Sequence, residues 1–211
     1  VIVEDGPLTP ELYQVLEELE AQSSIPIKRC PLEQNRGLGL ALKYGVTQCQ
    51  YDVIARMDTD DIAVEDRFEQ QFELMGTENL DLLGGHIAEF IDQPDEIVSY
   101  RRVPIKHEDI IVYQRMRSAF NHMTVMFKKE MVLKAGNYED GLYMEDDLLW
   151  LNMISAGART GNVDQILCKV RVGAGMFERR GGLRYLKLYR QARKRMHARG
   201  QISYGEYLKS V

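Results

Sequence analysis

The sequence predicts an α/β fold in which helices flank a mixed, mainly parallel central sheet, followed by a helical C-terminal extension. Three observations carry this prediction. Short apolar runs alternate with segments of helical periodicity through the first half, at the spacing typical of βαβ units. The chain has 211 residues, 45% of them hydrophobic, which is enough to enclose one sizeable core. From Gly182 onward it is basic, with apolar residues every three or four positions.

The first half of the chain contains three strand–helix pairs. Each expected strand is a short apolar run, and each expected helix repeats apolar residues with a helical period. The expected strands are Val1–Glu4, Ile25–Pro31 and Tyr51–Met57. The expected helices are Leu8–Gln22, Leu38–Cys49 and Glu65–Met75. Thr9-Pro10 is the start signal of the first helix.

The second half is less regular, and strands and helices follow one another without a fixed order. The expected strands are Leu80–Ile91, Ile97–Arg102, Asn121–Phe127 and Val163–Val172. The expected helices are His107–Met116, Lys129–Ala135 and Glu145–Ser155. We find no internal repeat or linker. We therefore predict one domain over residues 1–181 and a basic helical extension over residues 182–211.

Composition restricts the partners and the compartment. The net charge of −5 and the pI of about 5.5 argue against nucleic acid as a partner, since phosphate binding favours a basic face. Cys30, Cys49 and Cys168 show no metal-binding spacing and no disulfide framework, which is typical of a reducing compartment. No apolar run is long enough to span a bilayer. These features predict a cytoplasmic protein.

Two of the expected strands end on acidic residues. Val1–Glu4 runs into Asp5, and Tyr51–Met57 runs into Asp58-Thr59-Asp60-Asp61. Ligands bind at the carboxyl ends of parallel strands, so we expect both groups at one edge of the sheet. Clustered carboxylates suit Mg²⁺ or Mn²⁺ that also holds a substrate diphosphate. The alternative is that Asp58 or Asp61 caps the next helix, but a cap needs only one carboxylate.

A second acidic cluster, Glu145-Asp146-Asp147, opens an expected helix. A carboxylate in this position can act as a general base over an acceptor hydroxyl. The alternative is purely structural, because negative charge near a helix N-terminus is favourable by itself.

Three arginines are further candidates for the substrate site. Arg56 lies inside an apolar strand, where an unpaired charge is costly, so we expect it to pair with an acid. Arg179 and Arg180 precede two glycines and could clamp a diphosphate, since arginine binds phosphate oxygens in a bidentate manner. An exposed basic turn is the alternative for this pair.

Five segments in a fixed order resemble one known family. They read "VIVEDG", "NRGLGLALKYGV", "ARMDTDDIAVEDRFEQQ", "FNHMTVMFKKEMVLKAGNY" and "MEDDLLWLNM". Over nearly its whole length the chain is similar to the family-2 inverting glycosyltransferases, which have the GT-A nucleotide-sugar fold. The resemblance implies a metal-dependent hexosyltransferase with Mn²⁺ or Mg²⁺ as cofactor. Its implied donor is a UDP-sugar, and its acceptor a saccharide or lipid-linked sugar in bacterial polysaccharide biosynthesis at the cell envelope.

The resemblance also implies roles for residues on the donor side. Asp5 matches the acid that hydrogen-bonds the uracil of a UDP-sugar. Asn35 and Gly37 belong to the Asn-x-Gly motif that precedes the next helix. His122 matches a histidine near the donor or acceptor, although a structural role is also typical of a histidine at a strand start.

The two acidic clusters receive specific roles from the same resemblance. Asp58 and Asp60 match the DxD pair, with Asp60 as the direct metal ligand and Asp61 beside it. Asp146 matches the catalytic base, because Trp150 then stands where an aromatic residue follows it. The adjacent Glu145 and Asp147 leave this register open by one residue.

Two other functions remain open. A sugar nucleotidyltransferase also uses metal-binding carboxylates, but the Glu145-Asp146 motif argues against it. A non-catalytic domain that binds sugar or a partner is the other alternative, and the intact acidic motifs argue against that.

The chain begins inside a strand-like run, so we expect the family's first strand to precede it. Without that strand, its neighbour in the sheet would have an unpaired edge, and a homodimer through this edge is open. The basic extension could lie on the inner face of the membrane, or simply be solvated.

Overall fold

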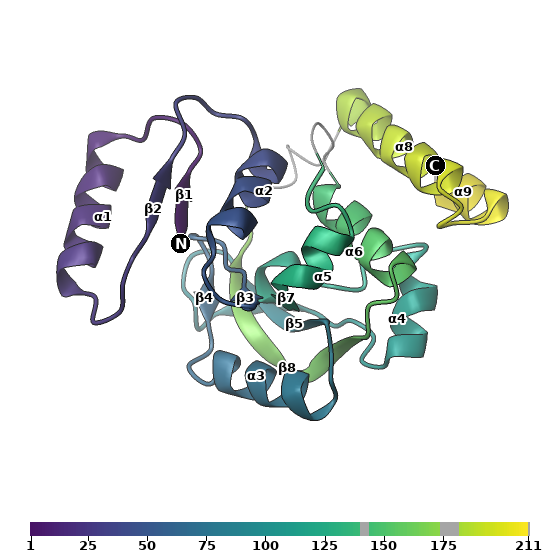
Figure 1. Cartoon of the computed structure of the whole chain (residues 1–211), viewed down its shortest axis with the longest axis horizontal. Coiled ribbons are helices and arrows are strands. Elements are labelled where there is room, and N and C mark those ends of the chain that lie inside the picture. The colour runs from purple at the N-terminus through teal and green to yellow at the C-terminus, as the bar shows by residue number, and fades with distance from the viewer. Residues whose placement is uncertain (140–143, 174–181, 211) are drawn as a thin grey trace.

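The computed structural model describes residues 1–139, 144–173 and 182–210 (Figure 1). Its centre is a six-stranded sheet in the order β3-β7-β5-β8-β4, with β6 paired to the far part of β5. The strands are β3 (Val53–Ala55), β4 (Ile62–Ala63), β5 (Leu82–Phe90), β6 (Ile97–Arg101), β7 (Met126–Lys128) and β8 (Thr160–Arg171). The predicted α/β fold with a mixed sheet and flanking helices is confirmed.

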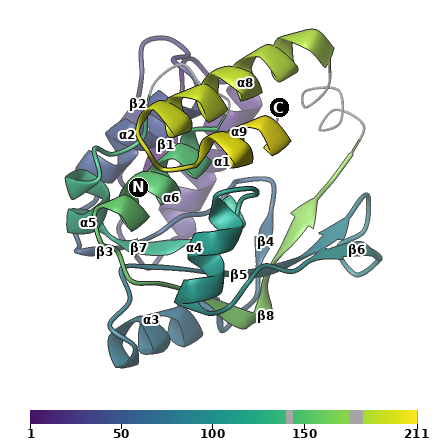
Figure 2. The ribbon, with the colours of Figure 1, turned by 90° about the vertical axis from the view of Figure 1, so that its right-hand side faces the viewer.

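Helices cover both faces of this sheet (Figures 1 and 2). One face carries α3 (Arg67–Thr77), and the other carries α4 (His107–Gln114), α5 (Lys129–Lys134) and α6 (Glu145–Ser155). Consecutive side chains of a strand point to opposite faces. Leu82 therefore packs in the core with Trp150 and Leu149 of α6, whereas Leu83 packs in the core with Met75 of α3. The alternation along β5 builds a core on each side.

A smaller layer precedes the main sheet. Strand β1 (Ile2–Glu4) pairs in parallel with β2 (Arg29–Pro31), and α1 (Pro10–Gln22) connects them. Helix α1 starts where the Thr9 hydroxyl accepts a hydrogen bond from the Leu12 amide at 3.4 Å. Helix α2 (Leu38–Gln48) then leads to the main sheet, and its Val46 lies in the core beside α5 and α6.

The expectation that the sheet is mainly parallel is wrong for the six-stranded part. Only β5 and β8 run parallel there, whereas β3–β7, β5–β7, β4–β8 and β5–β6 are antiparallel. The reason is the mode of connection. A chain that reverses through the short turn after β5 pairs antiparallel, and only a crossover returns it in the same direction.

Two local expectations also differ from the structure. Residues 121–125 contain the 3₁₀ helix η1 (His122–Thr124) in place of the start of a strand, and Ile62–Ala63 forms a strand that the pattern did not predict. In η1 the Thr124 hydroxyl donates to the Asn121 carbonyl at 2.8 Å, and the Asn121 amide group donates to the Gly85 carbonyl at 2.8 Å. Such local side-chain bonds compete with a strand ladder.

The C-terminal extension is a helical pair, α8 (Gly182–Ala198) and α9 (Tyr204–Ser210). It packs on α6 through a small core of Leu148, Leu151, Met196 and Ile202. Within the described ranges, the helices are too short or too polar to cross a membrane.

Candidate functional site

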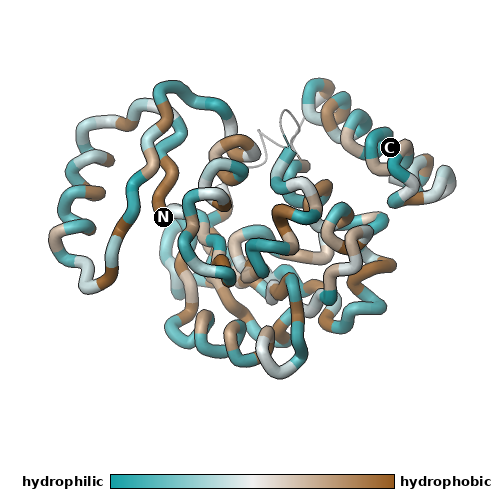
Figure 3. Tube along the Cα trace, viewed as in Figure 1, coloured by the Kyte–Doolittle hydropathy of each residue, from teal (hydrophilic) through white to brown (hydrophobic). Residues whose placement is uncertain are grey.

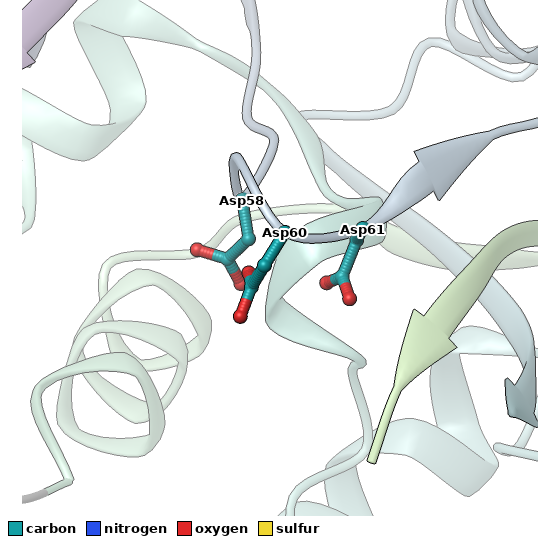
Figure 4. A group of neighbouring side chains, drawn as sticks. All are labelled: Asp58, Asp60 and Asp61. Atoms are coloured by element: carbon teal, nitrogen blue, oxygen red, sulfur yellow. The ribbon is translucent and has the colours of Figure 1, made fainter. Parts of the chain in front are cut away.

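The acidic loop is the segment that joins β3 to β4. Because these two strands lie at opposite ends of the sheet order, residues 56–61 lead from one edge to the other. Oxygen atoms of Asp58, Asp60 and Asp61 approach within 4.8 Å of one another (Figure 4). Three carboxylates converging in this way form a donor set that fits a hard divalent cation. These are the three residues that the sequence predicts as metal ligands.

Helix capping does not explain these carboxylates. Helix α3 begins at Arg67 with Asp66 at its N-cap position, well beyond the acidic loop. Asp58 and Asp61 therefore cap no helix, and the structural alternative considered for them is wrong.

Each carboxylate of the loop has a different environment. Asp58 forms a bidentate ion pair with Arg56, whose Nη1 lies 2.7 Å from Oδ2 and whose Nη2 donates to the other oxygen. Asp61 accepts a hydrogen bond from the backbone N–H of Arg171 in β8 at 3.1 Å. Asp60 is exposed and has no hydrogen-bond partner among the described residues. The expected ion pair of Arg56 with an acid is present, and it leaves Asp60 as the least engaged of the three.

Asp61 is the carboxylate that resists ionisation in this loop. Desolvation, reinforced by the charges of Asp58 and Asp60, raises its pKa to about 6. The Arg171 N–H opposes this increase in pKa but does not cancel it. A cation among the three carboxylates would stabilise the ionised form and offset their repulsion.

This pKa predicts a pH-dependent metal site. Only the ionised carboxylate binds a cation, so Mn²⁺ affinity should fall as the pH decreases from 7.5 through about 6, by about tenfold at pH 5. Calorimetric titration with Mn²⁺ at pH 7.5, 6 and 5 measures this. Asp61→Asn should lower the affinity at pH 7.5 and flatten its dependence on pH. An affinity that stays constant between pH 7.5 and 5 would contradict a role for Asp61.

The second acidic cluster occupies the first turn of α6, as predicted, and its members face different surroundings. Asp147 is 8% exposed, and its Oδ1 accepts a hydrogen bond from the Gln114 side chain of α4 at 2.7 Å. Asp146 is 26% exposed, and its Oδ1 accepts from the Asp147 backbone N–H at 2.9 Å. Asp147 thus joins two helices, whereas the Asp146 side chain stays partly exposed.

His122 lies beside Asp146. Its Nε2 is 2.9 Å from the hydroxyl of Tyr138, and its Nδ1 is 4.0 Å from Oδ2 of Asp146. Burial, together with the nearby charge of Arg56, holds the pKa of His122 well below its usual range, so the ring is neutral at pH 7. Trp150 meets the ring edge-on, with 5.7 Å between centroids. His122 therefore has both a packing role and a position next to the candidate base.

The two acidic clusters share one electrostatic environment. Desolvation, then the charges of Asp147 and Glu145, raises the pKa of Asp146. Arg56 opposes this shift at Asp146 and at Glu145. Because Arg56 also holds Asp58, the acidic loop and the first turn of α6 lie within electrostatic range of the same guanidinium. A carboxylate with a raised pKa is suited to receive a proton.

The residues predicted on the donor side lie where the loop after β1 meets the loop after β2. The Asp5 carboxylate accepts the backbone N–H groups of Arg36 at 2.7 Å and Gly37 at 3.0 Å, and Asn35 Oδ1 also accepts from Gly37 at 3.2 Å. Gly37 has φ of 87°, and a Cβ on Gly6 would lie 2.6 Å from the Asn35 nitrogen. The glycines thus allow the β1 and β2 loops to meet. Asp5, Asn35 and Gly37 lie together as one unit.

Other predicted and missed residues complete the site. Arg179 and Arg180 lie outside the described residues. The sequence reasoning missed Tyr138, Gln114 and Arg171, which hold His122, Asp147 and Asp61. Tyr138 ends the segment FNHMTVMFKKEMVLKAGNY, but no sequence signal indicated His122 as its partner. Gln114 and Arg171 lie 33 and 110 positions from the groups that they contact.

Comparison with known proteins gives a consistent result. The profile described as glycosyl transferase family 2 matches residues 1–138. An uncharacterized glycosyltransferase of Haemophilus influenzae is 44% identical over 188 residues, covering 89% of this chain and 69% of the relative. The UDP-Gal:alpha-D-GlcNAc-diphosphoundecaprenol beta-1,3-galactosyltransferase of Escherichia coli is 33% identical over 213 residues, covering 100% of this chain and 76% of the relative.

Solved structures share the fold at low sequence identity. TarS of S. aureus in complex with UDP-GlcNAc has a TM-score of 0.67 at 15% identity, covering 90% of this chain and 55% of TarS. The mannosyltransferase PcManGT of Pyrobaculum calidifontis, in complex with GDP-Man and Mn²⁺, has a TM-score of 0.67 at 14% identity, covering 93% of this chain and 54% of that one. The chain thus spans about half the length of these two structures.

Proposed function

This chain belongs to glycosyl transferase family 2, and we propose that it transfers a sugar with inversion from a UDP-sugar to a hydroxyl group of a saccharide or lipid-linked acceptor. One observation carries the proposal. The carboxylate cluster of the acidic loop, which suits a cation, and Asp146, whose pKa is raised, lie within electrostatic range of the same arginine, Arg56. Leaving-group stabilisation and proton removal are the two tasks of such a reaction. The biological setting that we propose is polysaccharide biosynthesis.

The donor diphosphate would lie at the acidic loop. Asp60 is the direct ligand that we propose for Mn²⁺ or Mg²⁺, with Asp58 and Asp61 completing the carboxylate set. When bound, the ion supplies charge neutralisation for the departing diphosphate. Arg56 fixes Asp58 from the protein side, because its two Nη atoms hold both carboxylate oxygens. We propose Arg179 and Arg180 as further diphosphate contacts.

The uracil and ribose would lie at the loop built by Asp5, Asn35 and Gly37. Asp5 already accepts two backbone N–H groups, so its carboxylate is fixed in position before a donor binds. A carboxylate can accept further hydrogen bonds from a uracil edge with its remaining lone pairs. The donor would therefore bind to a carboxylate that the loop already holds in place.

The acceptor hydroxyl would lose its proton to Asp146. Its raised pKa favours proton uptake, and its partial exposure gives an acceptor access to the carboxylate. His122, held by Tyr138, stands 4.0 Å from Asp146 and would limit its orientation. The hydroxyl oxygen then attacks the anomeric carbon from the face opposite the diphosphate, the bond to the diphosphate breaks, and the configuration inverts. The negative charges of Glu145 and Asp147 help to raise the pKa of Asp146.

The test is a donor panel. With Mn²⁺ present, we expect release of UDP from at least one UDP-sugar, with UDP-Gal tried first because it is named for the Escherichia coli relative. GDP-Man serves as the matched nucleotide control, and EDTA should stop the release. An acceptor bearing GlcNAc on a lipid diphosphate should increase the rate. Release of GDP from GDP-Man, with no release of UDP from any UDP-sugar, would reject the uridine donor. Release of UDP that persists in EDTA would reject the metal.

A further inference from the structure

Helix α8 is unusually basic. The segment Gly182–Ala198 contains no Asp or Glu. Its cations fall into two groups. Arg193 is 2% exposed and donates to the Arg115 carbonyl and to Ser210 Oγ. Arg195, and Arg199 just after the helix, both pair with Glu139 and hold its pKa low, at about 2. These three arginines attach α8 and α9 to the rest of the protein.

The second group has no such structural role. Arg184, Lys187, Arg190 and Lys194 are exposed and have no ion-pair or hydrogen-bond partner among the described residues. Unpaired cations do not contribute to the docking of α8. Their number on one helix calls for another explanation than fold stability.

Two leucines share one side of the helix with three of these cations. At 3.6 residues per turn, Leu183, Leu186, Lys187, Arg190 and Lys194 fall on one face, which we call the basic–leucine face. Leu183 is 86% exposed and Leu186 is 39% exposed. The opposite face holds Ala192 and Met196, both fully buried. Figure 3 shows how hydrophobic and hydrophilic residues alternate along α8. The helix thus has two distinct faces, one packed on the protein and one open.

Helix α9 also has exposed apolar and aromatic residues, and one of its tyrosines lies beside the basic–leucine face. Leu208 is 55% exposed and Tyr204 is 62% exposed. A shallow groove between the two helices is lined by residues of the basic–leucine face and by Tyr207. Apolar side chains, cations and an aromatic ring therefore meet at one surface of the extension.

We propose that the basic–leucine face binds an anionic lipid bilayer and holds the protein at the membrane surface. A basic helix with exposed leucines places its apolar residues at the acyl boundary and its cations among the headgroup phosphates. A second copy of the chain fits less well, because the unpaired cations of the two faces would repel each other. A purely solvated face accounts for the cations but not for a leucine as exposed as Leu183.

The position of the extension suits this role. Leu148 and Leu151 of α6 pack against Met196 of α8, and the first turn of α6 carries Asp146. The helix that carries the proposed lipid face therefore packs on the helix that carries the candidate base. If the proposed function is correct, binding to the bilayer would hold the protein at the surface in which a lipid-linked acceptor is anchored. The membrane face itself does not depend on that function.

Vesicle binding tests the proposal directly. The full chain is centrifuged with vesicles of phosphatidylcholine alone or with 30 mol% phosphatidylglycerol, at 50 and 300 mM salt. We expect binding to the anionic vesicles only, weakened at high salt. The triple variant Lys187→Gln/Arg190→Gln/Lys194→Gln should bind roughly 100-fold more weakly, since each cation near such a surface contributes about 1 kcal/mol. Leu183→Ser/Leu186→Ser should also reduce binding.

A matched control separates the face from the net charge. Lys43, Lys106 and Arg159 are exposed on other elements, so Lys43→Gln/Lys106→Gln/Arg159→Gln removes the same charge elsewhere. This control should bind like the wild type. Equal weakening by both triple variants, equal binding to neutral vesicles, or no vesicle binding at all would overturn the proposal. Concentration-dependent dimerisation lost in the leucine variant, without vesicle binding, would assign the face to a second copy. The assay uses no sugar donor, so its failure is distinct from failure of the proposed function.

Discussion

Asp146→Asn should reduce sugar transfer by roughly 10²–10⁴-fold while donor affinity stays within a few-fold, because general-base catalysis contributes about this much. The carboxamide keeps the shape of the side chain but cannot take up the acceptor proton. Asp146 lies in α6, apart from the three carboxylates proposed to hold the metal, so UDP affinity with Mn²⁺ should remain. Transfer rate and calorimetric UDP affinity, measured on one preparation, separate the two effects.

The neighbouring residues provide the control. Asp147→Asn retains an oxygen that can accept from Gln114, so it should preserve transfer within a few-fold. Because desolvation raises the pKa of Asp146, the wild-type rate should fall as the pH decreases below neutrality. This part of the pH profile should be missing in Asp146→Asn. Strong loss in Asp147→Asn or Glu145→Gln with a mild effect in Asp146→Asn would move the base by one residue. Mild effects of all three substitutions would show that the acidic cluster only stabilises the N-terminus of α6.

Asp60→Asn should reduce UDP binding in Mn²⁺ to the level measured in EDTA. The variant removes one charged hard ligand from the site. It also removes a negative charge that lies close to Asp58 and Asp61. The melting temperature without metal should therefore stay constant or increase, since repulsion between like charges is relieved. Unchanged UDP affinity with Mn²⁺ present would reject Asp60 as a metal ligand.

Asp58→Asn is the contrasting variant in the same loop. It should also weaken binding, but it removes the charge that pairs with Arg56, which is only 6% exposed. We expect a loss of about 1–3 kcal/mol in the free energy of unfolding, because a buried cation would lose its ionic partner. Denaturant unfolding of the two variants without metal should therefore differ. Equal stability would show that the ion pair does not hold the loop.

Local signals in the sequence were enough to predict most of the elements. Helix α6 covers Glu145–Ser155 as predicted, because its acidic first turn and its apolar residues are close in the chain. The acidic loop after β3 was also predicted, since three aspartates follow an apolar run directly. Five short motifs in order indicated the family, and the family is confirmed. In each case the determining residues lie within a few positions of one another.

The direction of the strands and the division of roles among neighbouring acids depend on tertiary structure. Strand pairing is set by how the chain returns to the sheet, so antiparallel neighbours replaced the parallel ones expected from alternation alone. Asp146 and Asp147 are adjacent and chemically identical in the sequence. Only the packing of α4 against α6 brings Gln114 to Asp147 and leaves Asp146 accessible, because burial and hydrogen bonding over 33 positions exist only after the helices meet.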